Sequence, residues 1–256
     1  MIFESHAHYE DEKFDEDREC LLKSLEENGI GTVINVSSSL ETIEKTLQLI
    51  KEYPYMYGAV GVHPEECKLL DEEKLVYIRN SAKEDKIVAI GEIGLDYYWD
   101  EPAREIQKKW FEAQIELARE TKLPMIIHSR DAALDTLEIM KKNKCEEIGG
   151  VIHCFSYGME MARQYLDMGF YLGIGGVVTF NNAKKMKEVV EYTPIERILI
   201  ETDAPYLSPV PNRGKRNSSL NLVYVVGEIA KIKGLDYDEV VEITEKNANA
   251  MYRINI

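Results

Sequence analysis

Residues 1–9 read MIFESHAHY and combine a short apolar start with two closely spaced histidines. Ile2 and Phe3 lead into a polar run in which His6 and His8 stand two positions apart. In an extended strand, residues i and i+2 point to the same side, so both imidazoles would face one way at a strand end. Two imidazoles placed in this manner can bind a divalent metal ion, although a surface strand with incidental histidines fits this pattern equally well.

The composition limits the classes of function. A chain of 256 residues is long enough for one large α/β barrel or for two small domains. Its hydrophobic content of 45% and charged content of 30% are ordinary for a globular enzyme. The net charge of −15 argues against a surface that coats nucleic acid, yet metal ions and a few arginines can still bind a phosphate locally.

The sequence also predicts where the protein works. Its four cysteines form no CxxC pair, and no apolar leader follows the acidic N-terminus. No run approaches the roughly 18 consecutive apolar residues of a membrane span. We therefore expect a reduced, cytoplasmic protein with no membrane contact and no obligate protein partner. The cysteines are Cys20, Cys67, Cys145 and Cys154.

Short apolar runs alternate with amphipathic segments along the whole chain. After the opening strand, strands are predicted at Thr32–Val36, Met56–Val62, Ile87–Ile90, Leu123–Ile127, Gly150–Ile152, Tyr171–Phe180 and Ile198–Ile200. Helices are predicted at Asp15–Asn28, Ser39–Tyr53, Asp71–Ala82, Pro102–Thr121, Ala132–Lys144, Met159–Met168, Ala183–Tyr192, Leu220–Lys233 and Asp238–Arg253.

Eight short apolar strands that alternate with helices indicate a closed parallel barrel. We predict an α/β fold, the TIM (β/α)8 barrel, as a single domain over residues 1–256, because no linker or charge block suggests a boundary. A doubly wound open sheet is the alternative, but it usually carries a glycine fingerprint after the first strand, and this chain has none there.

Every histidine of the chain falls at the carboxyl end of a predicted strand, where two acidic residues join them. In a barrel these ends converge on one mouth, so residues far apart in sequence become neighbours. Imidazole nitrogens with carboxylate oxygens suit Zn, Mn, Fe or Mg. The candidate metal ligands are His6, His8, Glu92, His128, His153 and Asp203, and His63 lies at the same mouth.

Six ligands are too many for one catalytic ion, so we expect two divalent ions (Mg, Mn or Zn) that share Glu92. His6, His8 and Asp203 would hold the first ion, because the first and eighth strands are neighbours in a closed barrel. The adjacent fifth and sixth strands would supply the second ion's ligands. Two ions roughly 3.5–4 Å apart can orient a water molecule and neutralise a leaving oxygen, which indicates a hydrolase.

The motifs resemble those of the TatD family of metal-dependent hydrolases, in the amidohydrolase-like superfamily. They occur in family order over the whole length: SHAH at 5–8, GVHP at 61–64, GEIGLDY at 91–97, IIHSRDA at 126–132, IHCFS at 152–156, ETDAPYL at 201–207 and PNRGKRN at 211–217. The resemblance implies a nuclease that often acts on a DNA end with Mg or Mn, and it implies the same six ligands.

Two positions depart from the family pattern. Family members usually have Asp where this chain has Glu4, and usually Glu-Pro where it has Ser218 and Ser219. We expect the first departure to affect the support of the metal-binding histidines. The second leaves the rim of the substrate site, and therefore the identity of the substrate, open.

Three further residues are candidates for substrate binding. The resemblance favours a phosphate contact for His63, with a third metal or simple packing as alternatives. Arg130 is placed to bind a phosphate bidentately, and a salt bridge to Asp131 or another acid is equally compatible with its position. Arg213 belongs to a basic cluster with Lys215 and Arg216, which is either a solvated loop or a guide for a nucleic-acid strand.

Other side chains near the mouth have weaker assignments. Glu201 points the same way as Asp203 by strand alternation and is expected to support a ligand rather than to be one. Tyr97 and Tyr98 follow the fourth strand and are candidates for stacking on a base.

Together these patterns predict metal-dependent hydrolysis of a phosphodiester, as by a 3′–5′ exonuclease-like deoxyribonuclease that acts on a DNA end. Glu92 and Asp203 are the predicted catalytic residues, with Asp203 accepting the proton of the attacking water. One alternative is the same site acting on an ester or amide, such as a misacylated aminoacyl-tRNA. The other is a barrel that binds a partner without catalysis.

Overall fold

The computed structural model describes residues 1–99 and 101–254, and the other three positions of the predicted domain lie outside this description. Within the described residues, eight parallel strands pair in chain order to form one sheet. The strands are β1 (Ile2–Ala7), β2 (Ile30–Val36), β3 (Met56–Val60), β4 (Ile87–Asp96), β5 (Met125–Arg130), β6 (Gly150–Ile152), β7 (Tyr171–Ile174) and β8 (Ile198–Ile200).

The sheet closes on itself between its first and last strands. Ala7 pairs in parallel with Ala204, which lies just beyond β8. On either side of this bridge the amide of Asp203 donates to the carbonyl of His6 at 3.0 Å, and the amide of His8 donates to the carbonyl of Ala204 at 2.7 Å. The predicted TIM-like barrel is therefore confirmed, and the open-sheet alternative is wrong.

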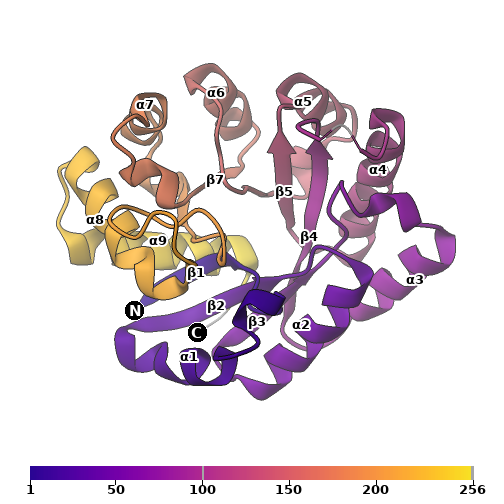
Figure 1. Cartoon of the computed structure of the whole chain (residues 1–256). Coiled ribbons are helices and arrows are strands. Elements are labelled where there is room, and N and C mark those ends of the chain that lie inside the picture. Colours follow the sequence, from indigo (N-terminus) through magenta and orange to yellow (C-terminus); the bar gives the residue numbers. More distant parts are fainter. Residues whose placement is uncertain (100, 255–256) are drawn as a thin grey trace.

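Helices surround the barrel (Figure 1). They are α1 (Arg18–Ser24), α2 (Leu40–Glu52), α3 (Glu72–Ser81), α4 (Arg104–Thr121), α5 (Ala133–Lys142), α6 (Met159–Asp167), α7 (Lys184–Tyr192), α8 (Leu222–Lys233) and α9 (Tyr237–Tyr252). Local sequence explains where some of them begin. The Ser39 and Thr42 side chains, for example, form a reciprocal capping box at the start of α2.

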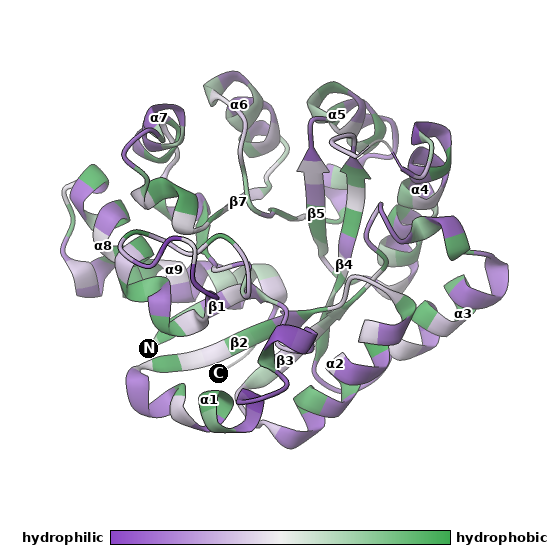
Figure 2. Ribbon diagram, viewed as in Figure 1, coloured by the Kyte–Doolittle hydropathy of each residue, from purple (hydrophilic) through white to green (hydrophobic). Residues whose placement is uncertain are grey.

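Apolar side chains fill both the inside of the barrel and the layer between strands and helices. Figure 2 shows the amphipathic character of the helices, which carry both hydrophobic and hydrophilic residues. Inside the barrel, the end of α9 packs against the first strand: the Tyr252 ring stacks on Phe3 at 6.0 Å, and its hydroxyl donates to the Ser5 carbonyl at 2.7 Å. This contact closes the barrel interior at the end opposite the mouth.

Three predicted elements differ most from the observed ones, and several others differ by two or three residues at an end. The fourth strand continues past Ile90 to Asp96, because residues 93–96 pair with β5. The seventh strand ends at Ile174, and Gly176–Thr179 forms a short 3-10 helix instead. A Cβ atom at Gly176 would lie 2.3 Å from the Leu207 carbonyl oxygen, so the loop after β8 packs directly on this backbone. The first helix is also shorter than predicted.

Among the described residues, no helix combines the length and the apolar character needed to cross a membrane.

Candidate metal centre

The first ligand group consists of His6, His8 and Asp203. His6 lies within β1 and His8 just after it, and their Nε2 atoms are 3.1 Å apart, as the strand alternation predicts. Asp203 comes from the loop after β8, and its Oδ1 lies 3.8 Å from Nε2 of His6 and 3.4 Å from Nε2 of His8. The hydrogen bonds that close the barrel therefore also bring this group together.

The second ligand group consists of His128 and His153. His128 lies within β5, and His153 directly follows β6. The amide of His153 donates to the carbonyl of Ile127 at 3.0 Å, which continues the pairing of the two strands. As a result, Nδ1 of His128 and Nε2 of His153 lie 3.4 Å apart.

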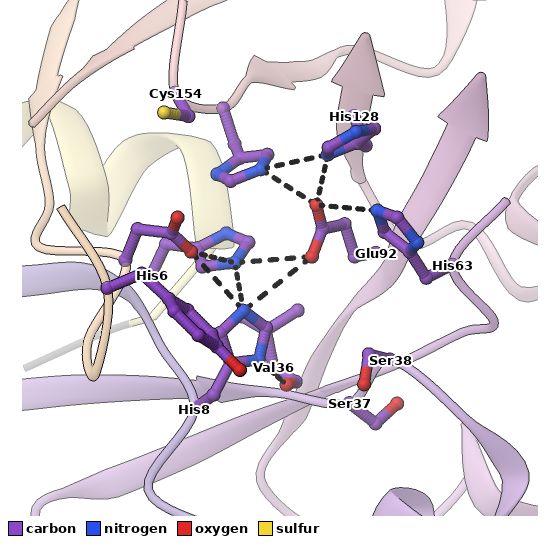
Figure 3. A network of polar contacts seen from close by, with 12 residues as sticks. His6, His8, Val36, Ser37, Ser38, His63, Glu92, His128 and Cys154 are labelled. Carbon is purple, nitrogen blue, oxygen red and sulfur yellow. Dashed lines mark hydrogen bonds and ion pairs between the residues drawn. The ribbon is translucent and has the colours of Figure 1, made fainter. Parts of the chain in front are cut away.

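Glu92 lies between the two groups (Figure 3). Its Oε2 is 3.5 Å from Nε2 of His6 and 3.7 Å from Nε2 of His8. Its Oε1 is 2.6 Å from Nδ1 of His128 and 2.7 Å from Nε2 of His153. One buried carboxylate therefore reaches both groups, one oxygen to each.

The donor atoms fit a divalent metal. His6, His8 and Asp203 each offer one ligand atom, and these atoms lie within 4.8 Å of one another. Side chains of His63, Glu92 and His128 meet the same condition on the other side. Nitrogen and carboxylate oxygen without thiolate is a set that Zn, Mn and related ions accept.

The neighbouring histidines determine the protonation state of the two carboxylates, Glu92 and Asp203. Burial alone would raise the pKa of Glu92, but the neighbouring His153 and His128 outweigh it and hold that pKa well below its usual range. Burial alone would also raise the pKa of Asp203, but its hydrogen bond with His8 and the charges of His153, His8 and His6 together outweigh burial and lower that pKa. Both carboxylates are therefore ionised at neutral pH and available to a cation.

His8 and His128 each have a supporting group on the far side of the ring. Nδ1 of His8 lies 2.7 Å from the carbonyl oxygen of Val36 and 3.5 Å from Oε1 of Glu10. Nε2 of His128 lies 3.0 Å from Oδ2 of Asp96. Such partners fix the orientation of the imidazole ring.

Sequence reasoning missed Asp96 and Glu10. Asp96 stands four positions after Glu92, so alternation puts both on the same side of one strand. That signal was present, but ending the strand at Ile90 concealed it. Glu10 repeats the two-residue spacing after His8, beyond the end of β1.

Glu201 occupies the position expected of a supporting residue. Its Oε1 lies 3.5 Å from Nδ1 of His153 and accepts a hydrogen bond from the amide of Cys154 at 2.5 Å. The side chain is buried against β7, where a Cβ atom at Gly173 would lie only 2.3 Å from Oε2 of Glu201. Glycine at 173 therefore makes room for this carboxylate.

Glu4 binds the loop that carries Asp203, and it also accepts a hydrogen bond from the backbone amide of His6 at 3.3 Å. It accepts hydrogen bonds from the amide of Thr202 at 2.8 Å, the hydroxyl of Thr202 at 2.6 Å and the hydroxyl of Ser219 at 2.9 Å. Burial raises the pKa of Glu4 to about 8, although these hydrogen bonds act in the opposite direction. The positions at which the chain departs from the family pattern are thus in contact with each other.

The candidate substrate residues lie in different environments. Nε2 of His63 is 3.9 Å from Oε1 of Glu92, and the His63 ring packs edge-on against His128 at 4.3 Å. Burial and the charge of His128 lower the pKa of His63 to about 3, so this imidazole is neutral. Arg130 is exposed and lies 3.8 Å over the Tyr98 ring. It pairs with no carboxylate in the described part of the chain, Asp131 included.

The basic cluster divides into two parts. Arg216 forms a bidentate ion pair with Asp17 at 2.7 and 2.6 Å, and it also donates to the carbonyl of Lys13 at 2.7 Å. Arg213 is exposed and lies 4.1 Å over the Phe180 ring. Arg216 is therefore occupied by a structural contact, whereas the guanidinium of Arg213 stacks on a ring and pairs with no carboxylate among the described residues.

Known proteins resemble this chain over its whole length. A family model described as "TatD related DNase" matches residues 3–253. The chain is 44% identical to the uncharacterized metal-dependent hydrolase YabD of Bacillus subtilis, over 100% of both chains. It is 34% identical to the uncharacterized metal-dependent hydrolase YcfH of Escherichia coli, over 100% of this chain and 97% of that one.

Solved structures have the same fold. The crystal structure of YjjV, a TatD homolog from Escherichia coli, superposes with a TM-score of 0.93 at 27% identity and covers 99% of this chain and 98% of that chain. A TatD family hydrolase from Entamoeba histolytica superposes with a TM-score of 0.88 at 26% identity, over 98% of both chains.

Proposed function

Because this chain belongs to the TatD family and is a metal-dependent hydrolase, we propose that it hydrolyses phosphodiester bonds at the end of a DNA strand. The proposal takes the form of a 3′–5′ exonuclease-like deoxyribonuclease. Its support from the comparisons is the description of the matching family model, since YabD and YcfH are themselves uncharacterized.

The observation that carries the proposal is the position of Glu92. Its two oxygens face separate ligand groups, with 3.5 Å to Nε2 of His6 on one side and 2.6 Å to Nδ1 of His128 on the other. This arrangement suits two divalent ions that share one carboxylate, as in many enzymes of phosphodiester hydrolysis. Ions held there would provide a nucleophile at neutral pH and neutralise the charge on the leaving oxygen.

Side chains of the protein would accept the proton of the attacking water and bind the substrate. Asp203, whose side chain is 17% exposed, faces the mouth more openly than Glu92 at 4%. It is ionised and can accept the proton of an attacking water. Arg130 and Arg213 carry exposed guanidinium groups that can bind phosphate oxygens, and the neutral His63 can donate one hydrogen bond to the substrate.

The test is an assay on an end-labelled single-stranded oligodeoxynucleotide after removal of bound metal by chelation. We expect shortening of the strand from its 3′ end when Mg, Mn or Zn is added back, and none with Glu92→Gln. Glu66→Gln is the matched control, because Glu66 is an exposed carboxylate outside both ligand groups. The proposal would be contradicted if the wild-type protein hydrolysed ester substrates but left DNA intact.

A second candidate function is hydrolysis of an ester or amide, including a misacylated aminoacyl-tRNA. A cavity of about 30 Å³ beside Asp203 favours it, because the lining side chains are largely apolar. The apolar residues that line it include Cys154, Phe155, Val177, Met186 and Leu207. A cavity of this volume holds one or two water molecules or a methyl-sized group. Faster turnover of small acyl esters than of DNA on one substrate panel would select this function.

A further inference from the structure

Two large aromatic side chains stand exposed where β4 leaves the barrel. Tyr98 is 53% exposed and Trp99 is 64% exposed. Trp110, the other tryptophan of the chain, is 5% exposed. Aromatic side chains contribute much to a core when buried, so an exposed pair beside a site is characteristic of a binding surface.

This pair is fixed to the metal centre by its neighbours. Asp96 contacts Nε2 of His128 with one carboxylate oxygen and accepts the amide of Tyr98 with the other, at 2.9 Å. The amide of Tyr97 donates to the carbonyl of Arg130 at 2.9 Å, and its hydroxyl donates to Asp135 at 2.7 Å. The backbone that carries the aromatic pair is therefore held against the carboxyl ends of β4 and β5.

A cation completes the surface. Arg130 stands two residues after His128 on β5, and its guanidinium lies 3.8 Å over the Tyr98 ring. The Trp99 ring meets Tyr98 at 4.8 Å with the planes perpendicular. Arg130 thus occupies a face of Tyr98, while most of the Trp99 ring remains accessible. Aromatic rings beside an arginine are the usual elements of a site for single-stranded nucleic acid.

We propose that Tyr98, Trp99 and Arg130 form a stacking site for an unpaired nucleobase of the strand whose end is cleaved. This inference rests on the proposed nuclease function and assigns the residues that hold the strand end. Trp99 receives the base, and Arg130 binds a flanking phosphate. A base can stack on Trp99 only when it is not paired with a partner strand.

The net charge of the protein favours such a site over a basic surface. A chain with a net charge of −15 repels a polyanion at long range, so a general basic surface cannot supply the affinity. Stacking does not depend on net charge and is effective at short range for every base. One stacked base together with one arginine would hold the strand end beside His128 without a basic groove.

Fluorescence tests this site directly, because Trp110→Phe leaves Trp99 as the only tryptophan. We expect a short oligothymidylate to quench the emission of Trp99 in this variant. A strand of equal length in which hydrogen replaces every base should not quench it. Absence of quenching by either strand overturns the stacking site, and equal quenching by both strands overturns it as well.

Kinetics give the second readout. Trp99→Ala should raise KM for oligothymidylate by roughly five- to a hundredfold and leave KM for the base-free strand unchanged. Trp99→Phe should restore most of the loss, and Tyr77→Ala, an exposed aromatic on α3, is the surface control. An equal rise for both strands overturns the stacking site.

Failure of the wild-type protein to hydrolyse any DNA contradicts the proposed function instead. Quenching by oligothymidylate alone would still support the stacking site in that case, so the two failures are distinguishable.

Discussion

The two ligand groups of the metal centre are held in place by different parts of the protein. The first group depends on the main chain: the amides of Asp203 and His8 form the hydrogen bonds that close the barrel, and the carbonyl of Val36 lies 2.7 Å from Nδ1 of His8. In the second group main-chain pairing also places the residues, with the amide of His153 on the carbonyl of Ile127, but side-chain carboxylates support the imidazole rings. Asp96 supports His128 at 3.0 Å, and Glu201 lies 3.5 Å from Nδ1 of His153.

Because of this difference, we expect some substitutions to weaken metal binding without affecting the folding of the barrel. Closure of the barrel brings the first group together, and the Glu4 side chain additionally holds the loop that carries Asp203. The second group can be weakened by one carboxylate substitution that leaves every strand pair intact. Glu92 belongs to neither group and contacts both, so its loss should affect the two together.

The largest expected effect is that of Glu92→Gln, which removes the group common to both sides. A neutral amide is a poor bridging ligand, so we expect loss of metal from both groups and no measurable turnover. Metal content per chain after dialysis, measured alongside turnover, checks this. Retention of one full equivalent of metal would mean that the two groups bind independently of Glu92.

Asp203→Asn should lower the turnover rate much more than it lowers the metal content of the protein. Asp203 belongs to one group only, so we expect most of the metal in the second group to remain. Loss of a general base typically lowers turnover by 10²–10⁴-fold. The same purified variant is assayed for metal and rate at limiting and at saturating metal. Recovery of near-normal turnover with excess metal would make Asp203 a ligand only.

Recovery would also require another proton acceptor. Glu201 is a nearby carboxylate, but the structure places it behind His153 with 1% of its side chain exposed. A water at the mouth could not reach it directly.

A smaller effect, confined to one side, is expected for Asp96→Asn. Substitutions of groups that support metal-binding histidines typically cost 10–100-fold in metal affinity. We expect that loss for one of the two ions, measured by metal titration, with the other unchanged. Glu10→Gln is the matched variant on the first side and should change affinity less, because Nδ1 of His8 keeps the carbonyl of Val36. Equal losses in both variants would remove the distinction between the groups.

The smallest expected effect concerns the loop that follows Asp203. Arg216 ties this loop to Asp17 and lies 4.6 Å over the Phe14 ring, across the seam between β8 and β1. Arg216→Ala should lower the free energy of unfolding by about 1 kcal/mol, measured with urea, and leave the salt dependence of KM unchanged.

Arg213→Ala provides the contrast within the same basic cluster. It should raise KM for DNA and flatten its salt dependence, because this guanidinium is free to bind a phosphate. A flatter salt dependence in Arg216→Ala would show that the ion pair with Asp17 opens when substrate binds.

Much of the fold followed from local sequence. Alternating apolar runs and helical segments predicted the barrel, since parallel strands need covering helices. The strand limits were less predictable. Glu92 looked like a strand end because it is charged, yet it lies inside β4, at an irregularity between the pairs that Ile90 and Ile93 form with β5. Tertiary pairing, which local sequence does not encode, overrides the cost of burying one carboxylate.

The candidate site shows the same limit. The histidines could be grouped from sequence because barrel topology brings strand ends together. Arg213 and Arg216 could not be distinguished, since the difference between them is an ion pair with Asp17. Glu4 was expected to support histidines, and its contact with Ser219 joins residues from opposite ends of the chain.

The most direct test of the account is the position of bound metal in the wild-type protein. Crystals grown with Mn²⁺ and measured by anomalous diffraction would locate each ion. The account predicts two peaks roughly 3.5–4 Å apart, one on each side of the Glu92 carboxylate. A single peak, or two peaks more than about 8 Å apart, would contradict a shared carboxylate, because one bridging group cannot span that distance.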